Sequence, residues 1–239
     1  MIQPAPRKPP LVIYGAGGHG QVVADAALAL GLRVLGFLDD ADPPPDPPPD
    51  LTDPSHPHDP GPPAPLSLPT PPPAASDTPP PRLQPDDPRL EDAEFHVAVG
   101  DNAARARLLQ QLLRQGRTLR SIVHPTAVLS PSARLGRGVY IGPLAVVNAA
   151  AQLGDAVIVN SAAVVEHHAQ LHAAAHLAPT AALAGHARVG ALTLVGLGAK
   201  VLPGISVGQH CTVAAGAVVV TDTPDHVTLR GVPARIFQK

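Results

Sequence analysis

The 239-residue sequence contains no tryptophan, a single cysteine and a single methionine, and only 2% of its residues are aromatic. With one thiol, Cys211, the chain cannot form a disulfide of its own, and a reducing compartment is compatible with that. A chain almost without aromatic rings suits a narrow core packed with Val, Leu and Ala. The shortage of cysteine therefore excludes a fold that depends on internal disulfides.

An excess of charge of one sign is lacking too, since the formal net charge is −2. This balance gives no electrostatic reason to expect nucleic acid or an anionic membrane as a partner. The apolar run 11–14 is too short for the hydrophobic part of a signal peptide, and no stretch approaches the length of a membrane span. We expect a cytoplasmic protein that binds neither nucleic acid nor a membrane.

What the sequence does contain is an aliphatic residue at every sixth position from Val123 to Val219. The seventeen positions are Val123, Leu129, Leu135, Ile141, Val147, Leu153, Val159, Val165, Leu171, Leu177, Leu183, Val189, Val195, Val201, Val207, Val213 and Val219. A period of six fits neither an amphipathic helix nor an alternating strand. It is typical of a short strand and a turn repeated around a coil.

The residue two positions before each of these is usually small, and it is alanine in eleven of the seventeen cases. Residues two apart in a strand face the same side, so each flat segment points one medium and one small side chain inward. Glycine often follows the aliphatic residue, as at Gly154 and Gly190, where a turn prefers close backbone approach or positive φ. Three flats of six residues would close a triangular coil of about eighteen residues.

Pairs such as Leu135-Gly136, Ile141-Gly142, Leu153-Gly154 and Val207-Gly208 make this region resemble the hexapeptide-repeat acyltransferases. That family folds as a left-handed parallel β-helix. The resemblance alone implies the left hand, because parallel crossovers are normally right-handed. Cys211 falls at one of the small inward positions, where we interpret it as core filler.

The N-terminal region reads as one βαβ unit. An apolar strand at 11–14 runs into Gly15-Ala16-Gly17-Gly18-His19-Gly20, a helical pattern follows, and a second strand at 33–38 ends at Asp39 and Asp40. Glycines in such a turn let backbone N–H groups approach a phosphate at a helix N-terminus, and the acid can accept hydrogen bonds from a ribose or base. We favour nucleotide binding over a tight turn without a ligand.

Proline dominates the next segment, with 21 of the chain's 32 prolines between Pro43 and Pro88. Such a composition cannot bury enough apolar surface to order itself, so we expect a disordered insertion over 41–90. Order should resume with a strand at 95–100 and a helix that begins near Asp101. We divide the chain into an α/β Rossmann-like βαβ domain (1–120) and a left-handed parallel β-helix domain with a C-terminal tail (121–239).

Histidines gather in one part of the repeat: His167, His168, His172, His176 and His186. His167 falls at a corner and His176 should point outward from a flat. Residues eighteen apart stack on successive coils, so His168 and His186 should lie one above the other. These histidines suit surface residues without a role, a metal site, or a general base, because imidazole titrates near neutral pH.

For metal, zinc-binding hexapeptide helices that resemble the γ-class carbonic anhydrases pair two histidines five apart with a third about two coils upstream. His167 and His172 are five apart, but Pro131 and Gly136 occupy the upstream positions. We therefore expect no metal.

Several further motifs together resemble one branch of these enzymes, the sialic acid and nucleotide-sugar acetyltransferases that include the bacillosamine-pathway enzyme. They are Ile13–Gly20, Phe37–Asp40, Val97–Asn102, Ile122–Pro125, Val164–His167 and Gly231–Arg235. The resemblance covers about four-fifths of the chain. It implies that the N-terminal domain binds a nucleotide-sugar and that the β-helix binds acetyl-CoA between the subunits of a trimer.

Carried over by position, the resemblance implies His167 as the base that deprotonates the sugar amine. It implies a nucleotide-sugar site made of Gly17, Gly18, His19, Asp39, Asp40 and Gly100, and acetyl-CoA contacts from His176 and Gly185. One departure concerns the base, because the family has Asp or Glu directly after the catalytic histidine. Here His168 follows it and Glu166 precedes it, so we consider both as groups that orient the base.

We expect an acetyl-CoA-dependent N-acetyltransferase that acts on a nucleotide-linked amino sugar by direct attack, since no activated Ser or Cys is placed for a covalent intermediate. O-acetylation of a sialic acid or serine is the alternative within the same class. A non-catalytic nucleotide-sugar-binding scaffold is the alternative outside it, because the family's acid is missing after His167. A nicotinamide-dependent oxidoreductase would need a larger N-terminal domain.

Overall fold

The computed structural model describes residues 9–39 and 80–237. The N-terminal domain has the elements β1 (Leu11–Tyr14), α1 (Gly18–Ala29), β2 (Val34–Leu38), the 3₁₀ helix η1 (Pro88–Leu90), β3 (Glu94–Val97), α2 (Asn102–Arg114) and β4 (Thr118–Leu119). The four strands form one parallel sheet in the order β2-β1-β3-β4. Strands are added on one side of β1 and then on the other, so the strand order reverses between β1 and β3. Open parallel sheets commonly bind ligands at such a switch point.

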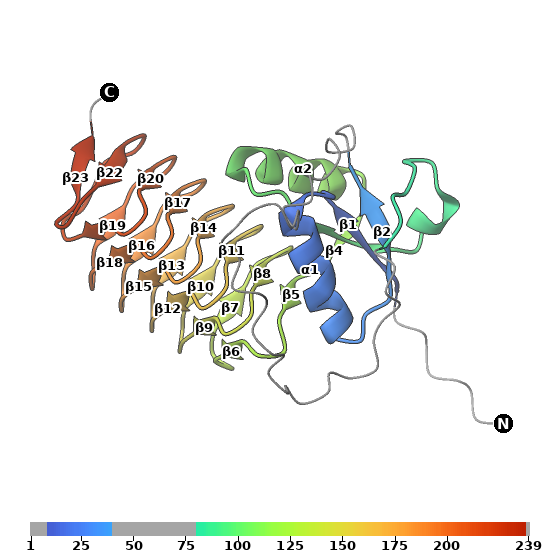
Figure 1. Ribbon diagram of the computed structural model, residues 1–239, viewed down its shortest axis with the longest axis horizontal. Coiled ribbons are helices and arrows are strands. Elements are labelled where there is room, and N and C mark those ends of the chain that lie inside the picture. Colours follow the sequence, from blue (N-terminus) through green and yellow to red (C-terminus); the bar gives the residue numbers. More distant parts are fainter. Residues whose placement is uncertain (1–8, 40–79, 238–239) are drawn as a thin grey trace, which may run out of the picture.

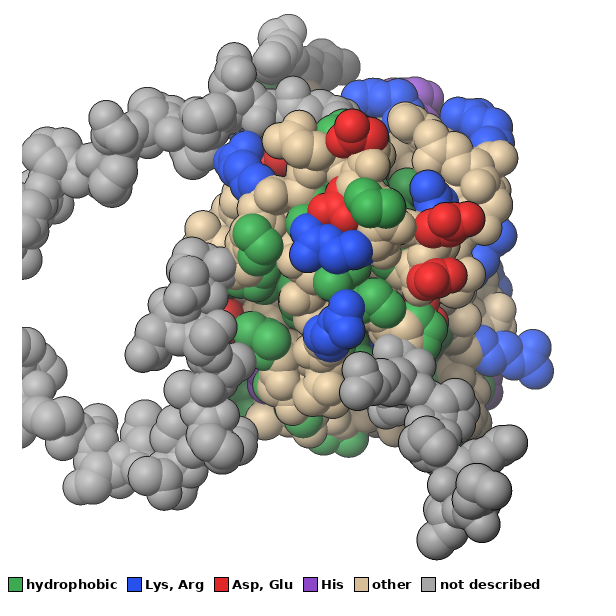
Figure 2. All heavy atoms as spheres, turned by 90° about the vertical axis from the view of Figure 1, so that its right-hand side faces the viewer, with side chains coloured by type: hydrophobic (Ala, Val, Ile, Leu, Met, Phe, Trp, Pro, Cys, Tyr) green, Lys and Arg blue, Asp and Glu red, His purple; other side chains and the backbone are tan. Residues whose placement is uncertain are grey.

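Alternation along β1 sends side chains to the two faces of this sheet. Leu11 and Ile13 pack with α1, and the same cluster includes residues of the first coils of the solenoid. Val12 packs with Leu109 and Leu112 of α2 on the other face. Figure 1 shows α1 beside the first coils. The outer end of this domain carries arginine side chains interspersed with Asp and Glu (Figure 2).

Part of the segment for which we expected disorder is ordered. Residues 80–90 return to the sheet, where Phe37 donates a backbone hydrogen bond to Pro81 and accepts one from Leu83. The side chains of Leu83 and Leu90 are buried. The prediction was wrong for this end of 41–90, because two leucines among the prolines supply enough apolar surface to hold the segment. The part at 41–79 lies outside the described residues.

The second domain is a left-handed parallel β-helix of two-residue strands. They are β5 (Ile122–Val123), β6 (Val128–Leu129), β7 (Arg134–Leu135), β8 (Tyr140–Ile141), β9 (Val146–Val147), β10 (Gln152–Leu153), β11 (Ile158–Val159), β12 (Val164–Val165), β13 (Gln170–Leu171), β14 (His176–Leu177), β15 (Ala182–Leu183), β16 (Arg188–Val189), β17 (Leu194–Val195), β18 (Lys200–Val201), β19 (Ser206–Val207), β20 (Thr212–Val213) and β21 (Val218–Val219). The second residue of every strand is one of the predicted aliphatic positions, so the fold class is confirmed.

Every third strand belongs to the same sheet, which gives the coil three faces. We call them the eight-stranded face (β5 to β20 with the two C-terminal strands), the six-stranded face (β6 to β21) and the five-stranded face (β7 to β19). Strands on one face pair in parallel with residues eighteen apart, as in Ile158 with His176. The aliphatic and alanine positions form one continuous buried core, which includes Cys211 as predicted.

The turns between faces use two devices. A Cβ on Gly190 would come within 2.4 Å of the Gln209 backbone nitrogen on the next coil, so glycine after the aliphatic residue permits close stacking. Positive φ is found elsewhere, three residues after the aliphatic position, at His168 and His186 among others, both with φ 60°. The expected reason for those glycines is thus close approach and not a left-handed backbone.

The last strands end the solenoid. β22 (Thr228–Arg230) pairs in parallel with β20, and β23 (Arg235–Phe237) then pairs antiparallel with β22. The guanidinium of Arg230 lies 3.8 Å from the ring centroid of Phe237. The N-terminal domain covers the other end of the eight-stranded face, over Ile122, Tyr140 and Ile158, all of them buried.

Candidate functional site

The glycine-rich turn between β1 and α1 divides its glycines between packing and open space. A Cβ on Gly15 would come within 2.7 Å of the Ala98 carbonyl oxygen, and one on Gly20 within 2.0 Å of the Gly15 oxygen. Gly17 and Gly18 have nothing within 4 Å of such an atom. Gly17 is the N-cap of α1 and provides no side-chain cap, so the first N–H groups of this helix are accessible to an anionic ligand.

The acid at the end of β2 reaches this turn. Asp39 accepts a 2.9 Å hydrogen bond from the Ala16 N–H, which fixes the carboxylate beside the glycines. Asp40 lies outside the described residues. Gly100 stands on the loop after β3, with nothing within 4 Å of a built Cβ. Of the nucleotide-sugar candidates, Gly17, Gly18, His19 and Asp39 therefore lie at the same edge of the sheet.

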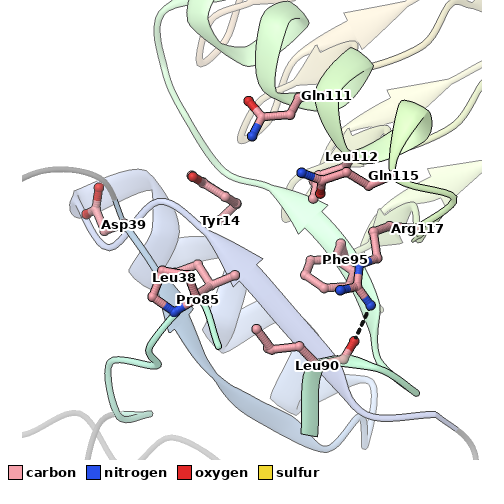
Figure 3. Close-up of a pocket in the computed structure, with 10 residues that line it drawn as sticks. All are labelled: Tyr14, Leu38, Asp39, Pro85, Leu90, Phe95, Gln111, Leu112, Gln115 and Arg117. Carbon is pink, nitrogen blue, oxygen red and sulfur yellow. Dashed lines mark hydrogen bonds between the residues drawn. The ribbon is translucent and has the colours of Figure 1, made fainter. Parts of the chain in front are cut away.

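A cavity of about 250 Å³ opens at that edge (Figure 3). Tyr14 and Asp39 stand on one side of it and Gln111 of α2 on the other. Arg117 donates to the Leu90 carbonyl at 2.9 Å, and its guanidinium lies 5.3 Å from the Phe95 ring centroid. The cavity thus combines a carboxylate, two amides and two aromatic side chains, groups that suit a polar ring with hydrogen-bonding edges.

His19 departs from a simple ligand contact, because it is largely enclosed where the two domains meet. Its ring packs edge-on against Tyr140 with centroids 5.3 Å apart, and its Nε2 is buried without a hydrogen-bond partner among the described residues. Burial, together with the nearby His96 and Arg105, lowers the pKa of His19 to about 4. The imidazole is neutral at physiological pH.

A second hollow, of about 560 Å³, lies where the N-terminus of α2 meets the eight-stranded face. Gly100, Asn102, His176, Leu194 and His210 are among its lining residues. His176 points outward from β14, as predicted, and is half-buried. Gly100 and His176, which come from different domains, thus share one hollow.

Hydrogen bonds determine the tautomer of His176. The Asn160 side-chain oxygen accepts from the Ser161 N–H at 2.8 Å, so the amide nitrogen must be the atom 3.2 Å from His176 Nε2. An amide nitrogen only donates, so Nε2 accepts and the proton resides on Nδ1. Burial lowers the pKa of His176 to about 3, helped by Arg105 and His19, and the ring remains a neutral donor.

Arg105 of α2 joins the domains, and its side chain is completely buried. The guanidinium donates to the carbonyls of Ala156 and Ala174, both at 2.8 Å, on successive turns of the solenoid. It also donates to Val99, to Gly100 and to the Asn102 side chain. Burial lowers its pKa to about 10, which leaves the group charged at neutral pH. This contact sets the position of Gly100 relative to the solenoid.

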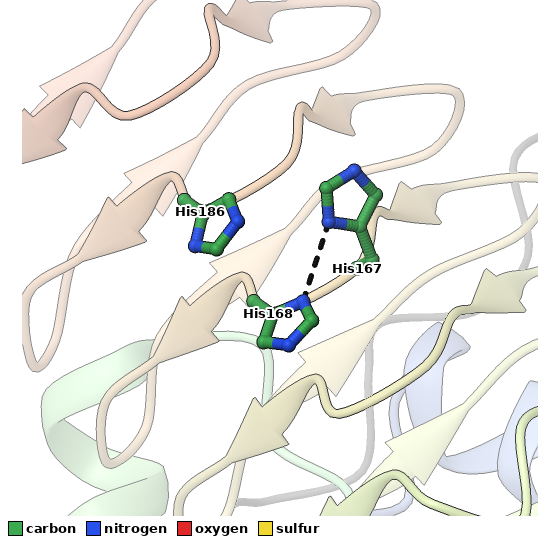
Figure 4. Close-up of side chains that lie close together, drawn as sticks. All are labelled: His167, His168 and His186. Carbon is green, nitrogen blue, oxygen red and sulfur yellow. Dashed lines mark hydrogen bonds between the residues drawn. The ribbon is translucent and has the colours of Figure 1, made fainter.

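His167 occupies a different part of the molecule, the edge between the six-stranded and five-stranded faces (Figure 4). Its ring is exposed, and its Nδ1 lies 3.3 Å from His168 Nδ1. A Cβ on Gly185, one coil further on, would come within 2.5 Å of His167 Cε1, so the absent side chain makes room for the imidazole. His168 and His186 stack with centroids 4.7 Å apart and ring planes 12° apart, as their spacing predicted.

The two groups considered for orienting His167 differ in placement. Glu166 accepts a 2.9 Å hydrogen bond from the Asn148 side chain on the preceding coil. His168 contacts the His167 ring directly. Of the two, His168 is therefore the one placed to orient the His167 ring. The ligand nitrogens of His167, His168 and His186 all lie within 4.8 Å of one another, so this edge also groups three potential metal ligands.

The coil separates these groups into two sets. An edge between two faces of a three-sided coil is opposite the third face, so His167 and Gly185 lie across the solenoid from His176 and the N-terminal domain. We expected His176 and Gly185 to contact one ligand. Within one chain they belong to different sets, because Gly185 follows β15 and His176 is on β14.

Four residues of the site escaped the sequence reasoning. Tyr140 and Asn160 could have been found from the eighteen-residue register, which places them near His176 on the preceding coils. Arg105 and His96, both buried, gave no signal. Their spacing in α2 and β3 is that of ordinary surface or core positions, and only the docking of the domains buries them.

Known proteins resemble this chain over its whole length. A protein-family model described as "PglD N-terminal domain" matches residues 10–47. A histidine-to-asparagine variant of perosamine N-acetyltransferase from Caulobacter crescentus, solved with CoA and GDP-perosamine, superposes with a TM-score of 0.76 at 35% identity. That superposition covers 96% of this chain and 97% of the other. The acetyltransferase domain of PglB from Neisseria gonorrhoeae, solved with acetyl coenzyme A, gives 0.75 at 34% identity and covers 95% and 98%.

A shorter match links the chain to another acetyltransferase. Serine acetyltransferase from Bacillus pumilus is 49% identical over 43 residues, which are 18% of this chain and 20% of that protein. The match thus spans about a fifth of such curated relatives, whereas the sugar N-acetyltransferases match from end to end. Among the described residues, no helix combines the length and apolar character needed to cross a membrane. The chain belongs to the family of hexapeptide-repeat nucleotide-sugar acetyltransferases.

Proposed function

We propose that the protein transfers the acetyl group of acetyl-CoA to the amino group of a nucleotide-linked amino sugar. The end-to-end likeness to a sugar N-acetyltransferase solved with CoA and a nucleotide-sugar carries this proposal. The open glycines at the start of α1 and the cavity beside Asp39 support a nucleotide site. The serine acetyltransferase match supports acetyl-CoA use, but it covers too little of those proteins to favour O-acetylation.

In the proposed reaction the sugar amine attacks the thioester carbonyl directly. His167 accepts the amine proton, the carbonyl oxygen gains charge in a tetrahedral intermediate, and CoA leaves as a thiolate that takes up a proton. The Nδ1–H of His176 is free to donate to the acetyl-CoA, since its Nε2 is engaged with Asn160. A neutral imidazole donates there without the cost of a buried charge.

Because His167 is across the solenoid from the chain's own N-terminal domain, the proposed site needs a second subunit. An edge of one solenoid placed against the eight-stranded face of its neighbour would bring His167 to the neighbour's His176 and sugar-binding domain. A closed ring of three such head-to-tail contacts is the homotrimer implied by the family resemblance. We propose that assembly, with acetyl-CoA between adjacent solenoids.

Replacing the base tests the activity. We expect His167→Ala to lower kcat for acetylation of a nucleotide-linked 4-amino sugar by about 10²–10⁴, the usual contribution of a general base. The matched control is His172→Ala, an exposed histidine on the next turn, which should retain wild-type kcat. Retention of most activity by His167→Ala would show that another group removes the proton.

Subunit complementation tests the shared site. Chains carrying His167→Ala and chains carrying His176→Ala should each be weak alone. Random mixed trimers should regain activity at about a quarter of their sites, where both wild-type histidines meet. A mixture that never exceeds the average of the two variants would place both histidines in one subunit's site, while leaving the reaction itself open to the first test.

A further inference from the structure

The edge that carries His167 has a second chemical capacity. Three exposed imidazoles from two successive coils converge there, and no acid or lysine is part of the cluster (Figure 4). We propose that His167, His168 and His186 bind one divalent transition-metal ion of the Zn²⁺ type. The site has three nitrogen ligands and leaves a fourth position open to water.

The distances agree with such a site. In a tetrahedral complex with Zn–N bonds of about 2.0–2.1 Å, two ligand nitrogens are about 3.3–3.4 Å apart. His167 Nδ1 and His168 Nδ1 are 3.3 Å apart. That separation is at the long end for a hydrogen bond between two nitrogens, and it also matches the spacing of two ligands on one ion. The two Nδ1 atoms are therefore already at the spacing of two metal ligands.

The third ligand needs only a small adjustment. The ligand nitrogens of all three histidines are within 4.8 Å of one another, so the ring of His186 must move by roughly 1–2 Å to reach the tetrahedral spacing. Its side chain is exposed, and a rotation of an exposed side chain meets little packing resistance.

The solenoid holds the backbones that carry these ligands. The His186 N–H donates to the His167 carbonyl at 3.0 Å, and the His168 N–H donates to Ala149 at 2.9 Å. His168 and His186 occupy the same left-handed turn position on adjacent coils, each with φ 60°. Gly185 leaves the space in which the His167 ring lies. The ligands are therefore preorganised by the coil and not by a flexible loop.

The protein contains its own comparison for this cluster. His210 and His226 also stack at left-handed turn positions, with centroids 4.8 Å apart and planes 10° apart. Among the described residues, no third ligand joins that pair in a metal-sized group. Imidazole favours Zn²⁺, Cu²⁺ and Ni²⁺, and a three-ligand chelate binds more firmly than two ligands. The His167 edge should therefore bind metal where the other stack does not.

A bound ion would oppose the proposed reaction, a consequence that rests on His167 being the base. Coordination through Nδ1 leaves the proton of the imidazole on Nε2, so the ring can donate there but can no longer accept. The metal would act as a reversible inhibitor at this edge. Metal binding itself does not depend on the catalytic assignment.

Cobalt provides a direct test on the full-length protein. The metal-free protein is titrated with Co²⁺ alone and followed by the strong visible absorption of four-coordinate Co²⁺, and the complex is then titrated with Zn²⁺. We expect one Co²⁺ per chain, displaced by Zn²⁺. His186→Asn keeps a residue that tolerates the left-handed turn and should weaken binding by at least the ~10–100-fold that loss of a supporting group costs. His226→Asn is the matched control and should bind as wild type.

The outcomes separate cleanly. No visible band, or an equal band in wild type and His186→Asn, overturns the site, as does a band that disappears in His226→Asn. Melting in the presence of Zn²⁺ gives a second readout, because an ion that binds only the folded state raises the Tm of wild type and His226→Asn more than that of His186→Asn. With each protein compared to its own metal-free rate of acetyltransfer, His186→Asn should require higher Zn²⁺ concentrations for inhibition than wild type.

Discussion

The covered eight-stranded face and the exposed edge at His167 place histidine side chains in different environments. On the covered face, His19, His96 and His176 are enclosed by the docked domain, and burial keeps them neutral. At the edge, His167 and its neighbours lie in solvent with only one another as ring contacts. One surface supplies neutral hydrogen-bonding groups enclosed by burial, and the other supplies exposed imidazoles whose nitrogens converge at metal-ligand spacing.

This difference shows that the hexapeptide repeat alone does not determine the protonation and exposure of the histidines that it carries. Both surfaces use the same strand and turn pattern, with the same eighteen-residue register. The docked N-terminal domain makes one of them dry. Variants that undock the domain, change the pH or disturb the edge should therefore affect the two surfaces differently.

Arg105→Met should have the largest effect, on the covered face. It removes five hydrogen bonds and leaves the Ala156 and Ala174 carbonyls buried without a partner. We expect a loss of about 3–5 kcal/mol in the free energy of unfolding, measured by urea denaturation. Arg107→Met, on the exposed side of the same helix, is the control and should change stability by less than about 0.5 kcal/mol. Equal losses would mean that Arg105 does not join the domains.

Acid should weaken the covered face next. The pKa of His19 and of His96 is lowered to about 4 and that of His176 to about 3 in the folded protein, against 6.5 when unfolded. Between pH 6.5 and about 4 these three histidines are therefore protonated in the unfolded chain but remain neutral in the folded protein. Stability is complete above pH 6.5 and falls through this window, by on the order of 2 kcal/mol per histidine at pH 5.

Denaturation midpoints from pH 7.5 to 4.5 measure this effect. His176→Asn removes one titrating group, so its stability should decline less steeply with acid than that of wild type. An identical slope for the two proteins would contradict a neutral, buried His176.

Gly185→Ala should act at the edge, on activity more than on stability. The new Cβ would meet His167 Cε1 at 2.5 Å, and the exposed ring can move away without disturbing the core. We expect kcat to fall by about 10–100-fold, since a displacement of about 1 Å in a catalytic group can cost that much, while Tm changes little. Gly190→Ala offers the reverse pattern, because its Cβ would meet the Gln209 backbone and should lower Tm. Normal activity in Gly185→Ala would separate this glycine from the base.

Glu166→Gln should have the smallest effect. Its carboxylate accepts from Asn148 and makes no contact with the His167 ring, so an amide should preserve the fold and alter kcat by less than about threefold. The comparison is His168→Ala, which removes the group in contact with His167 and should shift the pH profile of kcat. A tenfold loss in Glu166→Gln would assign the orienting role to the carboxylate instead.

Much of the solenoid could be predicted because each of its residues contacts neighbours at fixed sequence separations. The six-residue period gives every inward position, and the eighteen-residue register gives the stacking of His168 on His186. Its left hand came from family resemblance, since twist in single strands favours the opposite crossover.

The covered face could be predicted only in part. The glycine turn and the acid at the end of the second strand follow a local pattern that the sequence shows, but the hydrogen bond between Ala16 and Asp39 was not predicted. Arg105 meets the Ala156 and Ala174 carbonyls because α2 docks on the solenoid, and no sequence spacing encodes that docking. The order at 80–90 was missed for a related reason, because two leucines find a partner in β2 that composition does not reveal.

The antiparallel pairing of β22 with β23 affects how another chain could stack on the end of the solenoid. A parallel solenoid ends in an open strand edge, which invites another chain to continue the stack. Here the chain reverses and covers that edge of the eight-stranded face with its own last strand. A strand added at this face would have to pair with β23, whose direction is opposite to that of the coils. The antiparallel strand therefore disfavours end-to-end stacking of a second parallel solenoid on the eight-stranded face.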